Sequence, residues 1–258
     1  MRGYWDNFLK YKDLMIELTK KDITLKYRNS FLGIIWSVLN PLLFMLVLVI
    51  IFQEFFSSDI EYFAVYVLIG RLIYSCFSET TNFAMQSIVS NGGLIKKVYV
   101  PKYFFPISRV TSSFITSMLA MISLIPVMLL SGLNISLQSI YIILPLFYLL
   151  LISLGIGLIL ATIYTFFRDL QHLYSLALVI IMYTSAIFYP ASIIPERYMP
   201  IIRFNPIFDI IEMSRNILIY GILPSLQTNL FCLIYGMVVF LLGLGIFYKK
   251  QDKFIFYL

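Results

Sequence analysis

The chain has 258 residues, of which 60% are apolar and only 12% are charged. Soluble globular proteins carry roughly 25% charged residues, and a chain of this length cannot build a water-soluble core that buries so much apolar surface. This composition excludes a disordered protein, a nucleic-acid-binding domain and an ordinary soluble enzyme. A mean hydropathy of +0.90 leaves an integral membrane protein, most readily a helical one.

The first predicted element is an amphipathic helix over residues 4–21. Its apolar positions recur at spacings of four and three: Tyr4, Phe8, Tyr11, Met15 and Leu18. Its charged positions fall on another face: Lys10, Asp13, Glu17 and Lys20. This pattern is typical of a helix that lies along a membrane surface with Trp5 as an anchor. Such a helix either anchors the chain or also contacts a cytoplasmic partner.

Six segments are long and apolar enough to span a bilayer, which takes roughly 20 apolar residues. They cover about residues 31–53, 61–83, 108–130, 140–167, 173–193 and 228–248. The long uncharged run from Val110 to Phe167 divides at the turn formed by Ser131, Gly132, Leu133 and Asn134. We therefore predict an all-α membrane protein with six transmembrane helices in a single domain over residues 1–258.

The net charge of +6 follows from 19 Lys and Arg against 13 Asp and Glu. If the amino terminus is cytoplasmic, 15 of the 19 cations lie on the cytoplasmic side. Only Arg197, Arg203 and Arg215 then lie outside, and only Arg71 lies within a span. The positive-inside rule predicts that both termini are cytoplasmic. The basic charge thus reports topology, and no nucleic-acid partner is expected.

A short helix over about residues 91–100 is predicted between the second and third spans. Asn91 can cap it and Pro101 ends it. The exposed candidates for docking are Leu94, Ile95, Lys96, Lys97, Val98 and Tyr99. A solvated loop has little reason to be this apolar, so the segment is interpreted as a docking helix. The alternative is an interfacial segment that merely connects two spans.

The region over about residues 190–227 is too apolar for an ordinary external loop. Prolines punctuate it at Pro190, Pro195, Pro200 and Pro206. One helical face carries Ile207, Ile210, Ile211, Ser214 and Leu218. We predict short helices at or within the outer leaflet, where non-spanning backbone is tolerated if it is helical or packed in protein. The alternative is an external cap without a transport role.

Charged and aromatic residues within the spans are the candidates for a transport pathway. Arg71 and Glu79 lie eight residues apart on related faces of the second span. They are either functional or a structural pair, with Glu79 also able to reach the cytoplasmic edge. The aromatic candidates are Tyr66, Tyr74, Phe77, Tyr164 and Tyr183. Aromatic faces suit sugar rings, although interfacial belts and packing also explain such residues.

No catalytic residue, metal site or cofactor is predicted on this chain. The phosphate-binding pattern G-x-x-x-x-G-K-[ST] is absent from the sequence. His172 stands without a cluster of ligating residues, and Cys76 and Cys232 lie in apolar runs as small buried side chains. A membrane protein without an ATP site but with a cytoplasmic docking helix suggests a transporter that a separate ATPase drives.

Four motifs resemble the membrane subunits of bacterial ABC-type polysaccharide exporters. Residues 21–42 (KDITLKYRNSFLGIIWSVLNPL) resemble the first-span signature, and residues 90–101 (SNGGLIKKVYVP) resemble a second long motif. The shorter stretches RDL at 168–170 and FNP at 204–206 are also similar. The resemblance runs in order along essentially the whole chain.

The resemblance implies a homodimer in the cytoplasmic (inner) membrane with two copies of a cytoplasmic ABC ATPase, which would hold ATP and Mg. The substrate would be a lipid-linked polysaccharide of the O-antigen, teichoic acid or capsule type. The helix near residues 91–100 would couple to the ATPase. Lys26, Tyr27 and Arg28 would meet the lipid head group at the entry. The external gate would include Tyr189, Pro190, Pro195, Asn205 and Pro206.

Two other functions remain open at this point. A related ABC-type permease for a drug or lipid would share the six spans without an aromatic channel or external gate helices. A membrane-embedded enzyme, such as a lipid-phosphate transferase, would carry clustered Asp, Glu or His residues near one leaflet. No such cluster is found in the sequence.

Overall fold

A computed structural model describes residues 2–28, 30–56, 60–133 and 136–258. Side chains are described for residues 11–28, 30–53, 60–133, 136–200 and 202–258. Within these ranges the chain is helical and forms no strand, as the composition predicts. The side chains of Tyr4, Trp5, Phe8 and Lys10, and residue Asn134 of the predicted turn, lie outside the described residues.

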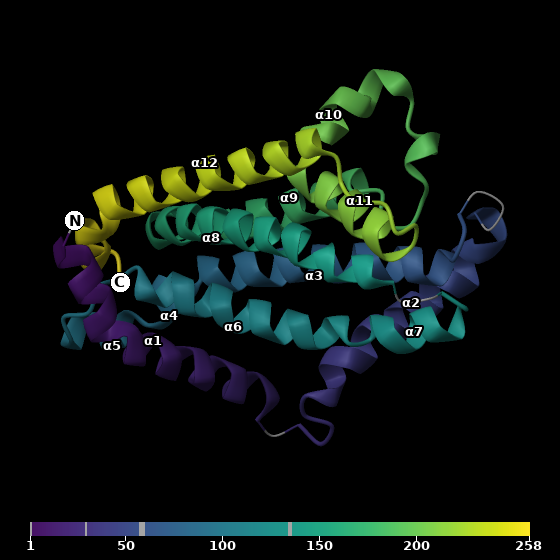
Figure 1. Cartoon of the computed structure of the whole chain (residues 1–258). Helices are drawn as coiled ribbons and strands as arrows, with labels where there is room; N and C mark the ends of the chain where they lie inside the picture. Colours follow the sequence, from purple (N-terminus) through teal and green to yellow (C-terminus); the bar gives the residue numbers. More distant parts are fainter. Residues whose placement is uncertain (1, 29, 57–59, 134–135) are drawn as a thin grey trace.

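The helices follow one another along the chain with short connections (Figure 1). Their bounds are α1 (Arg2–Tyr27), α2 (Ile35–Phe56), α3 (Phe63–Met85), α4 (Ser87–Ser90), α5 (Gly92–Lys97), α6 (Phe104–Met121), α7 (Leu124–Leu130), η1 (Leu137–Ile142), α8 (Ile143–Phe166), α9 (Leu170–Thr184), η2 (Ala191–Ile193), η3 (Glu196–Tyr198), α10 (Met199–Arg203), α11 (Pro206–Leu218), α12 (Leu226–Lys250) and η4 (Gln251–Phe256).

Five helices of the described chain are long and apolar enough to cross a membrane. They cover Ile35–Gln53, Phe63–Met85, Phe104–Leu130, Leu137–Phe166 and Leu226–Phe256. The third joins α6 to α7, the fourth joins η1 to α8, and the last joins α12 to η4. Four of them agree within a few residues with predicted spans, because a bilayer fixes the length that an apolar helix needs. The last extends eight residues past the predicted end at 248, since α12 continues into η4.

The predicted span over residues 173–193 is shorter in the structure. Helix α9 has 15 residues, and at 1.5 Å per residue it is about 22 Å long against a hydrocarbon core of roughly 30 Å. The chain leaves the helix after Thr184, and Ala186 takes a left-handed conformation with φ 47°. Pro190 then disfavours helix in the residue before it. Apolar composition alone therefore overestimated the length of this helix.

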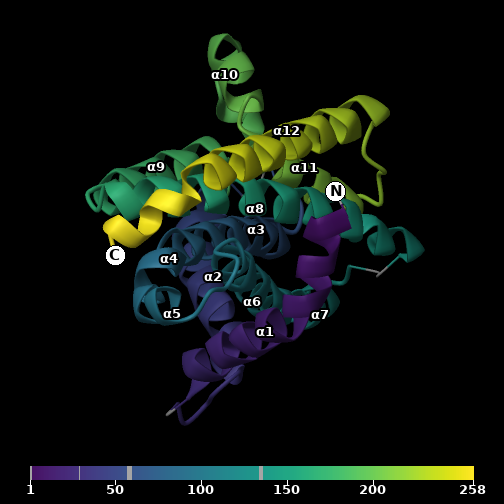
Figure 2. The same ribbon diagram turned by 90° about the vertical axis from the view of Figure 1, so that its left-hand side faces the viewer.

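Both termini lie at one end of the bundle, together with α4 and α5 (Figure 1). We call this the terminal end, and α7, α10 and α11 lie towards the opposite end. Helix α3 passes through the middle of the bundle, as the view in Figure 2 shows. Val65, Val67 and Leu68 of α3 are fully buried. By contrast, the side chain of Ile50 in α2 is 79% exposed, and α9 buries only Tyr174.

Helices α8 and α12 approach each other backbone to backbone. A Cβ atom added at Gly243 would lie 2.5 Å from the carbonyl oxygen of Gly155, and one added at Gly155 would lie 2.6 Å from the amide nitrogen of Phe240. Small residues allow this proximity in membrane helices, where van der Waals contact drives association. Gly245, two residues further along α12, has nothing within 4 Å of such an atom.

Helix α1 extends beyond the predicted residues 4–21, reaching Tyr27. Its apolar face packs against the bundle at the terminal end, where Leu18 joins a cluster with Ile95 of α5 and Phe254 of η4. Its charged face stays in solvent, where Lys20 pairs with Glu17 at 2.9 Å. The apolar face of α1 therefore packs against other helices of the same chain.

Candidate functional site

A cavity of about 500 Å³ lies between α1, α2, α3 and α6. Its wall carries polar side chains in a chain that is mostly apolar: Ser30, Ser37, Asn40, Ser75, Thr116 and Ser117. Lys26, Arg71 and Glu79 also line it, together with the aromatic rings of Trp36 and Phe44. Hydroxyls, an amide and charges within a membrane bundle indicate a space for a polar ligand.

Glu79 pairs with α1, and its partner is Lys26 instead of Arg71. The Nζ atom of Lys26 lies 2.9 Å from Oε2 of Glu79 and donates a longer hydrogen bond, 3.3 Å, to Oγ1 of Thr116. Both charged side chains are about half exposed, so solvent screens the pair. The pair ties the end of α1 to α3 and α6 at the rim of the cavity. The spacing of Arg71 and Glu79 in the sequence indicated a pair of these two residues and gave no sign of Lys26.

The three predicted entry residues take different positions at the end of α1. Lys26 and Tyr27 both line the cavity. The hydroxyl of Tyr27 is buried and has no hydrogen-bond partner among the described residues. Arg28 follows the helix and is exposed, outside the cavity wall. Two of the three predicted residues therefore meet at one polar site.

The aromatic channel candidates divide into core and surface residues. Tyr66 and Tyr74 are buried, and their hydroxyls donate to the backbone oxygens of Tyr189 at 3.2 Å and of Leu178 at 2.9 Å. The other candidates are Phe77, which is 1% exposed, Tyr164, whose hydroxyl donates to Gln171, and Tyr183, which is 53% exposed. The structure places Tyr66, Tyr74 and Phe77 in the packed core of this single chain.

The predicted docking segment is shorter than residues 91–100 in its helical part. Helix α5 ends at Lys97, and Val98 is extended. Asn91 occupies the N-cap position, but its side chain makes no capping bond and donates to the backbone oxygen of Ser87 at 2.8 Å. The cap predicted from the residue type is therefore not formed by the side chain, because the amide is engaged one turn back in α4.

The exposed residues of this segment form an apolar edge at the terminal end. Leu94 is 38% exposed, Val98 is 49% exposed and Tyr99 is 94% exposed, while Ile95 is buried. Lys96 and Lys97 are exposed beside them, and Pro101 follows the extended stretch. An exposed apolar edge flanked by cations is a surface on which another protein can dock.

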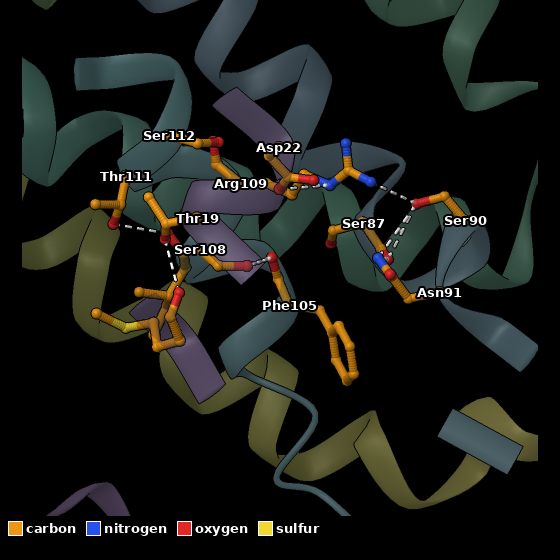
Figure 3. A network of polar contacts seen from close by, with 12 residues as sticks. Thr19, Asp22, Ser87, Ser90, Asn91, Phe105, Ser108, Arg109, Thr111 and Ser112 are labelled. Atoms are coloured by element: carbon orange, nitrogen blue, oxygen red, sulfur yellow. Dashed lines mark hydrogen bonds and ion pairs between the residues drawn. The ribbon is translucent and has the colours of Figure 1, made fainter. Parts of the chain in front are cut away.

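Arg109 of α6 joins three parts of the terminal end (Figure 3). Its Nε atom lies 3.3 Å from Oδ2 of Asp22 in α1, and its Nη2 atom donates to Oγ of Ser90 in α4 at 3.4 Å. Its guanidinium also lies 4.0 Å from the centre of the Phe83 ring in α3. Asn91 donates to the same Ser90 hydroxyl at 3.4 Å. Arg109 therefore connects α1 with the start of the docking segment.

From the sequence alone, Arg109 is one of the 15 cations predicted on the cytoplasmic side. A signal for its partner was present, since Asp22 continues the stripe of Met15 and Leu18 at the same spacing of three and four. A carboxylate on the apolar face of a helix needs a buried partner. Asp22 is 7% exposed in the structure, and Arg109 supplies that partner.

We expect Arg109→Met to lower the free energy of unfolding by about 3 kcal/mol at neutral pH, because Asp22 keeps a buried charge without its partner. Burial raises the pKa of Asp22, and the charge of Arg109 opposes that rise. Without Arg109 the pKa of Asp22 rises further. An acid with a raised folded pKa costs stability as the pH rises through that pKa, so the deficit should shrink in acid.

Thermal unfolding of the detergent-purified chain across pH measures this effect. Asp22→Asn combined with Arg109→Met should be more stable at neutral pH than Arg109→Met alone, because the double variant buries no charge. A deficit that stays constant with pH, or a double variant that is no better, would contradict the assignment.

A second network, centred on Arg215 of α11, holds the segment that follows α9. This side chain is 1% exposed, and its Nη2 atom donates to the backbone oxygens of Ala186 at 3.0 Å and Ile187 at 2.9 Å. Its Nη1 atom pairs with Glu212 at 2.8 Å, and its guanidinium lies 3.3 Å from the centre of the Tyr66 ring. Arg215 therefore donates hydrogen bonds to the backbone oxygens of the segment that follows α9.

From the sequence alone, Arg215 is one of three cations predicted on the outer side. Arg215 lies four residues after Ile211, on the apolar face of α11, so its position did indicate burial. The residues predicted for the gate are spread along the chain from the end of α9 to the start of α11. Asn205 caps α11 by accepting a hydrogen bond from the amide of Ile207 at 3.1 Å, and Pro206 lies in the first turn of that helix. Tyr189 donates to the backbone oxygen of Tyr183. Pro190 is buried and Pro195 is exposed.

Together these features define a multi-pass α-helical membrane protein with a polar cavity inside its bundle and an exposed apolar edge at the terminal end. A family model described as ABC-2 type transporter matches residues 14–219. The chain belongs to the ABC-2 type transporter family.

Relatives match most of the length of the chain at low identity. The O-antigen export system permease protein RfbA of Klebsiella pneumoniae is 28% identical over 246 residues, covering 94% of this chain and 93% of the relative. The protein of the same name from Myxococcus xanthus is 27% identical, covering 95% of each chain. The polysialic acid transport protein KpsM of Escherichia coli is 23% identical, covering 90% of this chain and 91% of the relative.

Proposed function

We propose that the chain is the membrane-spanning permease subunit of an ATP-driven exporter for lipid-linked polysaccharide in the cytoplasmic membrane. The observation that carries this proposal is the match to export permeases over at least 90% of the chain. The polar cavity supports it, because a glycan is rich in hydroxyls that such a wall can bind. The glycan itself would be of the O-antigen, teichoic acid or capsule type.

The proposed topology has six crossings, with α9 as the fifth. At one end of α9, Nη2 of Arg168 donates to the backbone oxygen of Tyr257 at the terminal end, 3.0 Å away. At its other end, Ser185 accepts from Asn205 beside α11 at 2.9 Å. Two termini on one side require an even number of crossings. We assign the terminal end to the cytoplasm, where the positive-inside rule places exposed lysines such as Lys96 and Lys97.

The proposed assembly is a homodimer with two copies of a cytoplasmic ABC ATPase, which would bind ATP and Mg. The outward faces of α2 and α9 are apolar and little buried, which supports contact with a second copy and with lipid. The docking edge formed by Leu94, Val98 and Tyr99 would receive the ATPase. Arg109 would relay its movement to α1 through Asp22.

In this proposal the substrate enters beside the cavity and leaves through the external segment. Lys26, Tyr27 and Arg28 would meet the anionic head of the lipid carrier at the end of α1. The segment from Tyr189 to Asn205, with its prolines, would form the external gate. ATP binding would draw the ATPase subunits together, move α5, and part the two permease subunits along a central seam.

The decisive experiment reverses the charges of the docking segment. Lys96→Glu combined with Lys97→Glu should leave basal ATP hydrolysis in place and reduce glycan export at least about tenfold, because a like-charge contact at a docking surface costs several kcal/mol. The measurement is export into vesicles that contain the chain and its co-purifying ATPase. The control is Lys249→Glu combined with Lys250→Glu on α12, which reverses the charge of another two adjacent lysines at the terminal end. Export at full rate in the Lys96 and Lys97 variant would overturn the assignment.

A further inference from the structure

Among the described residues, Arg71 is the one charged residue of the cavity wall that forms no ion pair within 4.0 Å. It lies in α3, about 12 Å along the helix axis from Phe63 and about 21 Å from Met85. Its guanidinium rests 4.2 Å from the centre of the Phe44 ring. Among the described residues, no carboxylate lies within 4.0 Å of it and no acceptor lies at hydrogen-bond distance. A cation at this depth is costly unless something pairs with it.

The nearest carboxylate along α3 is already engaged. Glu79 accepts from Lys26 at 2.9 Å, which leaves Arg71 as the excess positive charge of the cavity wall. The guanidinium carries N–H donors in a planar fork that matches the two oxygens of a carboxylate or phosphate. The buried hydroxyl of Tyr27, also on this wall, is a second unsatisfied donor. An anion that accepts hydrogen bonds would satisfy both groups.

The rest of the wall suits a sugar-sized group. Hydroxyls from α2, α3 and α6 face the same space as the rings of Trp36 and Phe44. A volume of about 500 Å³ lies within the range of small-molecule sites. Flat aromatic faces beside hydroxyl and amide groups can hold a sugar ring while the cation fixes an attached anionic group.

We propose that this cavity binds an anionic group on a sugar-bearing ligand, with Arg71 as the anion-binding residue. The inference rests on the proposed function for its ligand class and adds a preference for negative charge. The anion is a carboxylate or a phosphate. It comes either from an acidic sugar of the polymer or from the diphosphate that joins the polymer to its lipid.

Trp36 provides a reporter inside the cavity. The chain has two tryptophans, so Trp5→Phe leaves Trp36 as the sole tryptophan of the full chain. This chain in nanodiscs would be titrated with two pairs of probes at constant ionic strength. One pair is an oligoglucuronate against a glucose oligomer of equal length, and the other is farnesyl diphosphate against farnesol.

The anionic member of at least one pair should bind at least about tenfold more tightly, read from Trp36 fluorescence. Arg71→Met should abolish that difference, and Arg71→Lys should retain part of it because lysine keeps the charge without the fork. Lys253→Met, which removes an exposed cation from η4, should bind like the parent. Equal melting temperatures of the variants show that the fold is kept.

The two pairs of probes separate the sources of the anion. A preference within the sugar pair assigns the anion to the polymer, and a preference within the prenyl pair assigns it to the carrier. Equal binding of charged and neutral probes, no response of Trp36 to any probe, or an unchanged preference in Arg71→Met would overturn the inference. Export by the reconstituted complex tests the proposed function separately, since a permease without this anion preference can still export an uncharged glycan.

Discussion

Replacing Arg215 by methionine should lower the free energy of unfolding by about 3–5 kcal/mol, more than any other single cation of the chain. The substitution leaves the backbone oxygens of Ala186 and Ile187 without donors and leaves Glu212 without its partner. Each buried polar group that loses its partner costs roughly 1–3 kcal/mol. The side chain of Glu212 is 32% exposed, so most of the loss comes from the two backbone oxygens.

Thermal unfolding in detergent would measure this loss, with Arg197→Met, which removes an exposed arginine of η3, as the control. Arg197 is exposed, so its removal should change stability by less than about 0.5 kcal/mol. Arg215→Lys should still be clearly destabilised, because an ammonium cannot bridge two oxygens and Glu212 in the same geometry. If Arg215→Met melted like the control, Arg215 would not hold the segment that follows α9.

Two alanine substitutions on α12 should have opposite effects although they lie only two residues apart. Gly243→Ala should destabilise the chain by about 2–3 kcal/mol, because its new Cβ atom would lie 2.5 Å from a backbone oxygen of α8 that cannot move alone. Gly245→Ala should be neutral or stabilising by about 0.5 kcal/mol, because the site is open and alanine favours helix.

Melting temperatures of the two variants, with far-ultraviolet circular dichroism to compare helix content, would test this pair. Gly155→Ala, on the facing helix, should behave like Gly243→Ala, because its Cβ atom would lie 2.6 Å from the backbone of Phe240. A destabilisation of Gly245→Ala equal to that of Gly243→Ala would show that loss of glycine flexibility, and not the close approach of α8 and α12, sets the effect.

Much of the helical architecture could be predicted, because the bilayer imposes a simple rule on the sequence. The predicted span over residues 108–130 corresponds to Phe104–Leu130, and the one over 228–248 corresponds to α12. The end of α9 could not be predicted from charge, since residues 173–193 carry none, and Pro190 lies six residues beyond the last helical residue, Thr184. The turn at Ala186 depends on a hydrogen bond from Arg215, which lies 29 residues further along the chain.

The candidate site was predicted only in part for a similar physical reason. Lys26 and Tyr27, which the resemblance assigns to a lipid head-group entry, both line the polar cavity. The pairing of Glu79 was missed, because a periodic pattern on one helix indicates which face is buried and not what lies opposite. Tyr66 and Tyr74 show the same limit, since a tyrosine in a span can face a pathway or a neighbouring carbonyl group.

The contact between α8 and α12 also constrains how the protein can change shape. Two helices whose backbones touch at Gly155 and Gly243 cannot slide past each other, because packed interfaces switch between discrete arrangements and do not deform continuously. The pair should therefore move as one rigid body. Helices α2 and α9 bury little of their surface and have few interlocking side chains to break. Hinge or shear motion during an export cycle is expected at these two helices, with the α8–α12 pair as the fixed frame.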